Sequence, residues 1–305
     1  MPGWRFILKL LASALLLAAL FYYLDFESIY QNLSQVEFKL VFAALACLVL
    51  GQVLSAVRWA WLAEGLGLSV RLGRKIQLYF LGMFLSLFLP SILGGDVARG
   101  YLLAKGRKGK GWAAAASVLL ERLSGVGGLS LLVTVCMLFL QLPGIWWTVW
   151  LTGLSIFWGG MLSYRFWHSN LPAFLSRLKQ LPLLSSGFLL AWRRSIVLSI
   201  VFQTLIVQAH VFLGQAAGLE LSWAAYGVIV CLVALATALP ISFNGFGIRE
   251  GGYVGMSIYF GGDATAAAAM AVLWALVLVL AALPGGVVLW NLGGTKAITN
   301  MRTPT

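Results

Sequence analysis

The stretch LPSILGGDVARGY, residues 89–101, decides how the rest of this sequence is interpreted. It interrupts the apolar run at 76–88 with a proline and two glycines, and then places Asp96 and Arg99 where apolar side chains would be expected. A related stretch, residues 239–253, interrupts a second apolar run and presents Arg249 and Glu250. In both stretches the arginine is nine residues after the proline, and the offset between them is 150 residues. Paired, broken hydrophobic segments are typical of transporters built from internal repeats.

The composition indicates the class of protein. The chain has 305 residues, of which 61% are hydrophobic and 10% are charged, and it contains long apolar runs. These values predict an all-α polytopic membrane protein and exclude the soluble enzyme classes. The net charge of +12 would suggest a nucleic-acid partner in a soluble protein. Here the basic residues flank apolar runs, as membrane topology requires, so we expect no nucleic acid.

The apolar runs predict about six full transmembrane helices. The expected spans cover residues 6–24, 40–63, 112–141, 145–164, 195–217 and 265–292. Each is long enough, at helical rise, to cross the ~30 Å hydrocarbon layer. Residues 1–24 imitate a signal peptide but lack a convincing cleavage site, so we expect a retained first span.

The two interrupted runs predict re-entrant broken helical hairpins at residues 76–101 and 223–261. Residues 1–141 then form a first repeat of two spans, a hairpin and a span. Residues 142–292 form a second, inverted repeat of the same order, with an amphipathic interfacial loop at 165–194. A cytoplasmic tail, 293–305, follows. Complete crossing by the broken elements is the alternative, disfavoured because residues 241–261 are rich in glycine.

The positions of the basic residues agree with this topology. Lys39 is expected outside and four arginines in membrane segments. With Lys9, near the start of the first span, counted on the cytoplasmic side, sixteen of the 21 Lys and Arg residues are cytoplasmic. Five acidic residues are expected outside. Because cytoplasmic loops of multi-pass proteins are enriched in Lys and Arg, we expect a cytoplasmic (inner) membrane protein with both termini in the cytoplasm.

Arg99 and Arg249, at equivalent positions, are the candidate substrate-binding residues. Each is expected where the second half of a broken helix begins, beside free backbone N–H groups and a partial positive charge. A planar guanidinium suits a phosphate group. Two such sites related by an inverted axis predict a central cavity that attracts a phosphate-bearing headgroup.

Nearby acids leave a second interpretation open. Arg99 and Arg249 could instead be satisfied by internal ion pairs with Asp96, Glu121 or Glu250. Both interpretations hold if the substrate displaces a resting ion pair. Among the possible pairs, we favour Glu121 with Arg99.

Two other arginines need an explanation. Glu121 and Arg122 are adjacent, so on a helix they face different ways and at least one needs a partner on another element. Arg122 either lines a path or extends to the cytoplasmic interface. Arg58 lies beside Trp59 and Trp61, and we interpret it as an interfacial residue whose side chain extends toward water.

Smaller polar residues gather at the breaks and in the fifth span. Ser91, Ser242 and Asn244 could bind a headgroup, although capping of the half-helices is favoured. The side chains that could line a path through the span at 195–217, or form interhelical hydrogen bonds, are Gln203, Gln208, His210 and Gln215. The three cysteines have no CxxC spacing and His210 is isolated, so we expect no metal and no cofactor.

In these motifs the chain resembles the lysylphosphatidylglycerol synthase transmembrane region family, also called flippase-like. The matching stretches are FLPSILGGDVARGYLL, ASVLLERLSG and ISFNGFGIREGGYV. The resemblance covers nearly the whole chain and implies translocation of a phospholipid, a polyprenyl-phosphate-linked lipid or a hopanoid. The chain ends at Thr305 without an aminoacyltransferase domain, so synthase activity is not implied. Residue 275 is alanine where the resemblance implies an arginine after Trp274.

The predicted function is therefore a membrane lipid translocase that moves a polar or phosphate-bearing headgroup between leaflets through a cavity between the repeats. The sequence contains no G-x-x-x-x-G-K-[ST] motif, so ATP hydrolysis by this chain is not expected. A membrane enzyme acting on lipid phosphate or a lipid-linked sugar is the first alternative, although no catalytic motif is recognisable. A non-catalytic accessory subunit, paired with a separate lipid-modifying enzyme, is the second.

Overall fold

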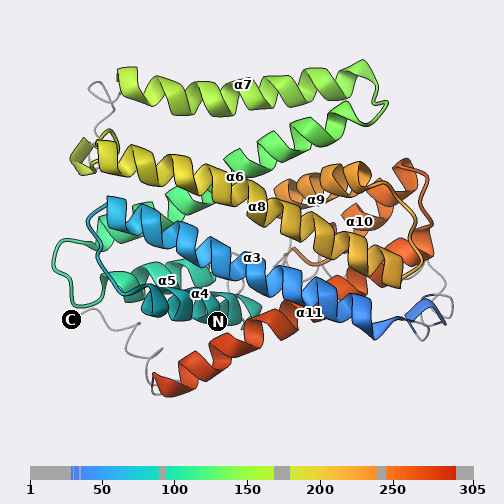
Figure 1. The fold of residues 1–305 in the computed structure, drawn as a ribbon, viewed down its shortest axis with the longest axis horizontal. Coiled ribbons are helices and arrows are strands. Elements are labelled where there is room, and N and C mark those ends of the chain that lie inside the picture. The colour runs from blue at the N-terminus through green and yellow to red at the C-terminus, as the bar shows by residue number, and fades with distance from the viewer. Residues whose placement is uncertain are drawn as a thin grey trace, which may run out of the picture.

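The computed structural model describes residue 29 and residues 31–33, 36–88, 94–167, 179–238 and 245–292. This described part of the chain is all helical, and Figure 1 shows its helices running mostly along one common direction. The expected span at 6–24 and the tail at 293–305 lie outside the described residues. The prediction of a polytopic α-helical protein is confirmed.

Five described helices are long and apolar enough to cross a membrane. They are α3 (Phe38–Gly65), α6 (Gly111–Leu138), α7 (Gly144–Trp167), α8 (Ser186–Ala216) and α11 (Ala264–Asn291). Each corresponds to one of the five expected spans that fall in the described residues. The largest difference is at α8, whose first nine residues belong to the segment expected to be an interfacial loop. Ser185 explains this early start, because its side chain caps the helix by accepting a hydrogen bond from the N–H of Phe188.

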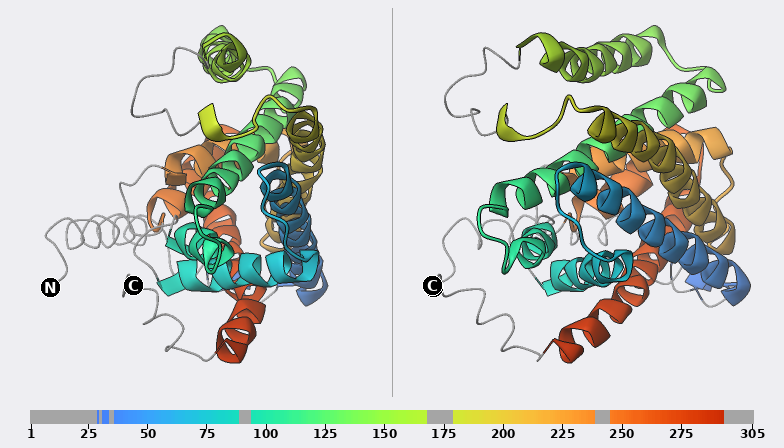
Figure 2. Two further views of the ribbon diagram at one scale, coloured as in Figure 1. Left: turned by 90° about the vertical axis from the view of Figure 1, so that its left-hand side faces the viewer. Right: turned by 60° about the vertical axis from the view of Figure 1, so that its left-hand side comes forward.

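The two interrupted runs form two pairs of shorter helices. The first pair is α4 (Leu72–Phe88) and α5 (Gly94–Ala104), and the second is α9 (Trp223–Ala238) and α10 (Ile248–Tyr259). The helices of each pair pack against one another. Pro90 and Pro240, which interrupt the runs in sequence, lie outside the described residues. Figures 1 and 2 show the α4–α5 pair near one end of the bundle and the α9–α10 pair near the other.

The first pair is closely packed because two glycines face one another. A Cβ added at Gly95 of α5 would lie 1.9 Å from the carbonyl oxygen of Gly82 in α4. Arg99, one turn later on α5, reaches back toward Gly82 and the ring of Tyr79. As α5 proceeds it therefore contacts progressively earlier residues of α4, so the two helices form an antiparallel hairpin.

The helix contacts have a regular correspondence between the two halves of the chain. The most extensive packing joins α3 to α8. If α3, α4, α5 and α6 are matched with α8, α9, α10 and α11, each major contact has a counterpart. Thus α4 packs on α11 and α9 on α6, while α3 packs on α11 and α8 on α6. Helix α7 lies at the edge of the bundle (Figure 1).

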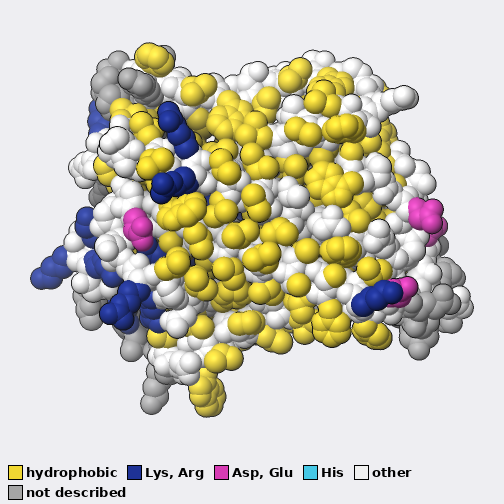
Figure 3. Space-filling model, in the orientation of Figure 1, with side chains coloured by type: hydrophobic (Ala, Val, Ile, Leu, Met, Phe, Trp, Pro, Cys, Tyr) yellow, Lys and Arg dark blue, Asp and Glu magenta, His cyan; other side chains and the backbone are white. Residues whose placement is uncertain are grey.

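Charged side chains are distributed unequally between the two ends of the bundle. The loops before α4 and after α5, with the start of α8, contribute the exposed basic residues Arg71, Lys105, Arg107, Lys108, Lys110, Arg193 and Arg194. Exposed charges at the opposite end are Glu37, Lys39, Glu220 and Asp263. Figure 3 shows most of the Lys and Arg side chains gathered at one end and hydrophobic side chains covering the surface between the ends. This distribution suits a helical bundle that spans a membrane.

Candidate functional site

Three arginines and two acids meet where α3, α5 and α6 pack together. We call this group the charge cluster, and its members are Arg58, Asp96, Arg99, Glu121 and Arg122. All except Arg122 are buried. Burying ions is costly unless each is paired and hydrogen-bonded, so the contacts within the cluster decide what it can do.

Glu121 is the centre of the charge cluster. Its Oε2 accepts a hydrogen bond from Nη2 of Arg99 at 2.7 Å, which confirms the pairing favoured by the sequence. Its Oε1 accepts from Nη2 of Arg58 and, at 3.3 Å, from the hydroxyl of Ser55. The Glu121 side chain is only 2% exposed. One carboxylate of α6 therefore links arginines of α3 and α5.

Asp96 joins α5 to α6 at the edge of the charge cluster. Its Oδ1 accepts a hydrogen bond from Nε of Arg99 at 2.9 Å, and its Oδ2 accepts from Nε of Arg122 at 2.8 Å. Arg122 is 49% exposed. Arg122 thus has a partner on another helix and also extends toward the surface, which agrees with the second interpretation offered for it. As expected for adjacent residues on a helix, Glu121 and Arg122 have different partners.

The guanidinium of Arg99 is enclosed by aromatic rings. It lies 4.7 Å from the ring centroid of Trp59 and 4.5 Å from that of Tyr79, distances typical of cation–π contacts. Trp59 is held in place because its indole N–H donates to the hydroxyl of Ser117. Arg99 Nη1 is buried and has no hydrogen-bond partner among the described residues. The most deeply enclosed arginine thus retains a free donor.

The interpretation of Arg58 as an interfacial residue was wrong. Its side chain is 3% exposed and donates to Glu121 and to the hydroxyls of Ser199, at 2.7 Å, and Ser55. Helix α3 continues to Gly65, which places Arg58 about 10 Å from the helix end. The Arg58 side chain therefore pairs with the buried carboxylate of Glu121 and does not extend to the membrane interface. The sequence signal for this contact is the acid at residue 121 in another span, not the neighbouring tryptophans.

The charge cluster has a net positive charge. Three guanidinium groups face two carboxylates, and both buried acids are already occupied by arginines. In the described part of the chain, no group of three or more His, Cys, Asp or Glu residues is arranged to hold a metal ion. The chemistry that the cluster offers is attraction of an anion and exchange of ion-pair partners.

In the second half, the arginine and acid form a local pair. Nε and Nη2 of Arg249 donate to Oε1 of Glu250 at 3.0 and 2.8 Å. Oε2 of Glu250 accepts the N–H of Gly247 at 2.7 Å, at the N-terminus of α10. The Arg249 side chain is 14% exposed and lies 5.2 Å from the Phe246 ring. Both predicted candidates are therefore ion-paired in this conformation.

The two arginines differ in their positions on the half-helices. Arg249 is the second residue of α10, as expected, but Arg99 is the sixth residue of α5. The prediction that both arginines lie at a helix N-terminus is wrong for Arg99. The glycines explain the difference, because Gly245 and Gly247 have φ values of 81° and 82° and delay the start of α10.

The polar residues predicted along the fifth span contact other helices. Gln203 Nε2 donates to the carbonyl of Gly125 in α6 at 3.4 Å, and Gln208 accepts from the indole N–H of Trp223 at 3.3 Å. These contacts support the interhelical interpretation. Gln215 lines a pocket of about 500 Å³ at the end of the bundle with Glu220. Ser91, Ser242 and Asn244 lie outside the described residues.

Comparison with protein families identifies the chain. The family model described as the lysylphosphatidylglycerol synthase TM region matches residues 6–286. The chain belongs to this family. A comparison with curated proteins found no match. The protein is thus a multi-pass membrane protein of a family related to membrane lipid metabolism, as the motifs predicted.

Trp274, the residue before Ala275, lies in a buried contact with His210. The ring centroids of Trp274 and His210 are 4.0 Å apart, and the ring planes are tilted by 39°. His210 also makes a 2.7 Å hydrogen bond through Nε2 with the hydroxyl of Tyr253, and its Nδ1 lies 2.8 Å from the carbonyl oxygen of Ile206. These contacts join α8, α10 and α11. His210 therefore connects helices rather than lining an open path.

Proposed function

We propose that this protein is a lipid translocase that moves a phosphate-bearing lipid between leaflets by binding its headgroup between two inverted repeats. The observation that favours this proposal is an arginine–acid pair on each of the two broken helix pairs. Arg99 pairs with Asp96 and Glu121, and Arg249 pairs with Glu250. Ionisable groups inside a membrane bundle are costly and usually mark substrate or ion pathways.

The proposed architecture has six spans and two re-entrant hairpins. Residues 1–141 form one repeat and residues 142–292 form the other, with the α4–α5 and α9–α10 pairs as their hairpins. Its support is the correspondence of helix contacts between α3–α6 and α8–α11. A pseudo-two-fold axis through the α3–α8 contact explains why these corresponding helices pack together most extensively.

The proposed mechanism is an exchange of ion-pair partners. In one exchange the lipid phosphate replaces the carboxylate of Glu250 beside Arg249, and in the other it frees Arg99 from Asp96. Arg249 is the more accessible of the two arginines, because it is partly exposed and its acid partner is on its own helix. Relative rocking of the hairpins then moves the headgroup, while Asp96, Glu121 and Glu250 are the candidate carriers of a coupled proton or ion.

The proposed location is the cytoplasmic membrane, with the basic end of the bundle in the cytoplasm. Lys108 and Glu220 are exposed at opposite ends and provide a matched test. In a variant without Cys47, Cys136 and Cys231, a membrane-impermeant maleimide should label Glu220→Cys in intact cells and Lys108→Cys only after permeabilisation. The reverse pattern would refute the orientation.

Reconstitution tests the proposed activity. The protein is placed in vesicles containing fluorescent phosphatidylglycerol, and loss of fluorescence to an external quencher reports exchange between leaflets. Arg249→Gln should slow exchange about tenfold, because a charge-assisted hydrogen bond is worth about 1.5–3 kcal/mol. Arg249→Lys should restore part of the rate, since lysine lacks the planar fork. Arg193→Gln, an exposed change on α8, is the control and should exchange at the wild-type rate.

The same vesicles separate the alternatives. A translocase leaves the mass of the lipid unchanged, whereas an enzyme alters it, and an accessory subunit has neither effect alone. Mass spectrometry of the recovered lipid therefore accompanies the quenching assay. Wild-type vesicles that match protein-free vesicles for phosphatidylglycerol, a polyprenyl phosphate lipid and a hopanoid would exclude translocation of these classes.

A further inference from the structure

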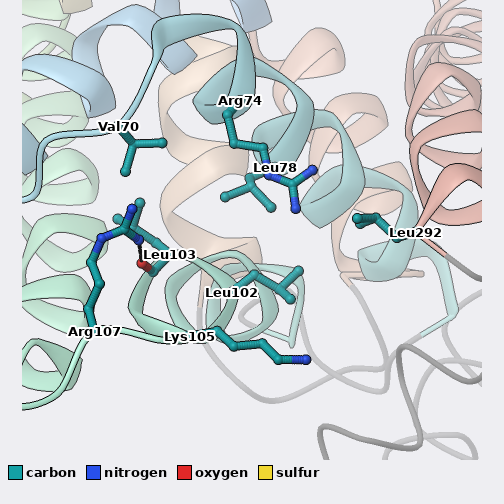
Figure 4. Close-up of a pocket in the computed structure, with 8 residues that line it drawn as sticks. All are labelled: Val70, Arg74, Leu78, Leu102, Leu103, Lys105, Arg107 and Leu292. Carbon is teal, nitrogen blue, oxygen red and sulfur yellow. Dashed lines mark hydrogen bonds between the residues drawn. The ribbon is translucent and has the colours of Figure 1, made fainter.

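A pocket of about 320 Å³ opens at the basic end of the bundle, apart from the charge cluster. It lies between the beginning of α4, the end of α5 and the end of α11. Its lining residues are Val70, Arg74, Leu78, Leu102, Leu103, Lys105, Arg107 and Leu292. Figure 4 shows the side chains of Arg74, Lys105 and Arg107 around those of Leu78, Leu102 and Leu103.

The lining combines two kinds of chemistry. Arg74, Lys105 and Arg107 contribute three cations, and none of the lining residues is acidic. The remaining lining residues are leucines and a valine, with Leu78 and Leu103 fully buried at the base. A free inorganic anion would use only the cations, whereas an anionic lipid would use the cations for its phosphate and the leucines for its glycerol and acyl groups.

Two of the three cations, Arg74 and Arg107, are held in place by hydrogen bonds. Nη1 of Arg107 donates to the backbone carbonyl oxygen of Leu103, and Nη1 of Arg74 donates to Oε1 of Gln77 at 3.4 Å. These bonds use one nitrogen of each guanidinium and leave others available to a ligand. Lys105 follows α5 directly and is exposed. The cations are therefore positioned around the pocket without being neutralised by a lining carboxylate.

Two helices, α4 and α5, connect the base of the pocket to the charge cluster. Leu103 is four residues after Arg99 on α5, which is one helical turn or about 6 Å. Leu78 directly precedes Tyr79, whose ring contacts Arg99. A ligand in the pocket thus rests on the same two helices that enclose the buried arginine.

We propose that this pocket is the loading site for the translocated lipid, and that it selects anionic lipids through their phosphate group. The inference rests on the proposed function, because it takes the ligand to be the cargo. The lipid headgroup binds Arg74, Lys105 and Arg107, and its apolar portion contacts Leu102 and Leu292. The α4–α5 hairpin then connects this site to Arg99.

Photo-crosslinking of the full-length protein tests the site. The protein is placed in phosphatidylcholine nanodiscs with phosphatidylglycerol that carries a diazirine near the glycerol. After illumination, mass spectrometry should find crosslinks at residues 70–78, 102–107 or 292. The combined change Arg74→Gln, Lys105→Gln and Arg107→Gln should reduce these crosslinks about tenfold, because each cation near a membrane surface contributes to the attraction of anionic lipid.

A matched variant removes the same charge elsewhere. Lys108→Gln, Arg193→Gln and Arg194→Gln replace three exposed cations that do not line the pocket. This control should keep at least half of the crosslinking, and equal losses in both variants would overturn a specific site. Competition by unlabelled phosphatidylglycerol supports a lipid ligand. Equal competition by inorganic phosphate would overturn it.

Exchange between leaflets separates this inference from the proposed function. If wild-type protein translocates phosphatidylglycerol and the pocket variant loses both crosslinking and translocation, the loading role is supported. A variant that loses crosslinking but translocates at the wild-type rate would overturn it. If wild-type protein translocates nothing, the proposed function and the loading role fail together, while the crosslinks still show whether the pocket binds anionic lipid.

Discussion

The two halves of the molecule pack their helices in corresponding ways but stabilise them with different chemistry. In the first half, ion pairs among Arg58, Arg99 and Glu121 join three helices. In the second half, Arg249 pairs with its neighbour Glu250 on one helix. The contact between α8, α10 and α11 is made by His210, Tyr253 and Trp274.

The two halves therefore share a pattern of helix packing, but the ion pairs that join helices in the first half have no counterpart among the described residues of the second. Separation of α5 from α3 or α6 would expose unpaired buried charges, so the first hairpin is held firmly. Movement of α10 leaves the Arg249–Glu250 pair intact, since both residues belong to that helix. We therefore expect the α9–α10 hairpin to move more readily than the α4–α5 hairpin.

Removal of the central acid should have the largest effect. Glu121→Gln leaves Arg58 and Arg99 without their shared carboxylate and should lower the free energy of unfolding by about 3–5 kcal/mol. Glu250→Gln weakens a pair within one helix and should cost about 1–2 kcal/mol. Thermal unfolding in detergent measures both. Equal loss of stability in the two variants would show that the halves do not differ in this respect.

The next largest difference should be in how much stability is lost when a methyl group is added between the two helices of each hairpin. A Cβ at Gly95 would meet the backbone carbonyl oxygen of Gly82, which cannot move independently of α4, so Gly95→Ala should cost about 3 kcal/mol. A Cβ at Gly252 would lie 3.0 Å from a methyl group of Val233, which can rotate, so Gly252→Ala should cost about 1 kcal/mol. The midpoint of thermal unfolding compares them. A more severe effect at Gly252 would contradict the closer packing assigned to the first hairpin.

Removal of an uncharged hydrogen bond in the second half should have the smallest effect on stability. Tyr253→Phe removes the hydrogen bond with His210 but keeps the ring, and should cost about 1 kcal/mol. Tyr226→Phe is a control for loss of a buried tyrosine hydroxyl, because that hydroxyl donates only to the backbone carbonyl of Leu219. Similar losses are expected for the two variants. A loss at Tyr253 as large as that of Glu121→Gln would make His210 a centre comparable to the charge cluster.

Much of the fold could be predicted from local sequence. Apolar runs established the five described long helices, and the interruptions near residues 90 and 240 established the two broken pairs, because hydrophobicity and helix-breaking residues act over one or two turns. The helix boundaries were less predictable, since Ser185 starts α8 early and Gly247 starts α10 late. The positions of the charged residues in the sequence also predicted the pairing of Arg99 with Glu121.

The role of Arg58 could be decided only by the tertiary structure. Its neighbours in sequence are interfacial tryptophans, but its partners Glu121 and Ser199 are 63 and 141 residues away. The same holds for the ring contacts of Arg99 and for the contact between the rings of Trp274 and His210. Composition and charge determine which segments enter a membrane, because each segment exchanges water for lipid largely on its own. Which buried charges meet depends on how distant helices pack, and that is a property of the folded bundle.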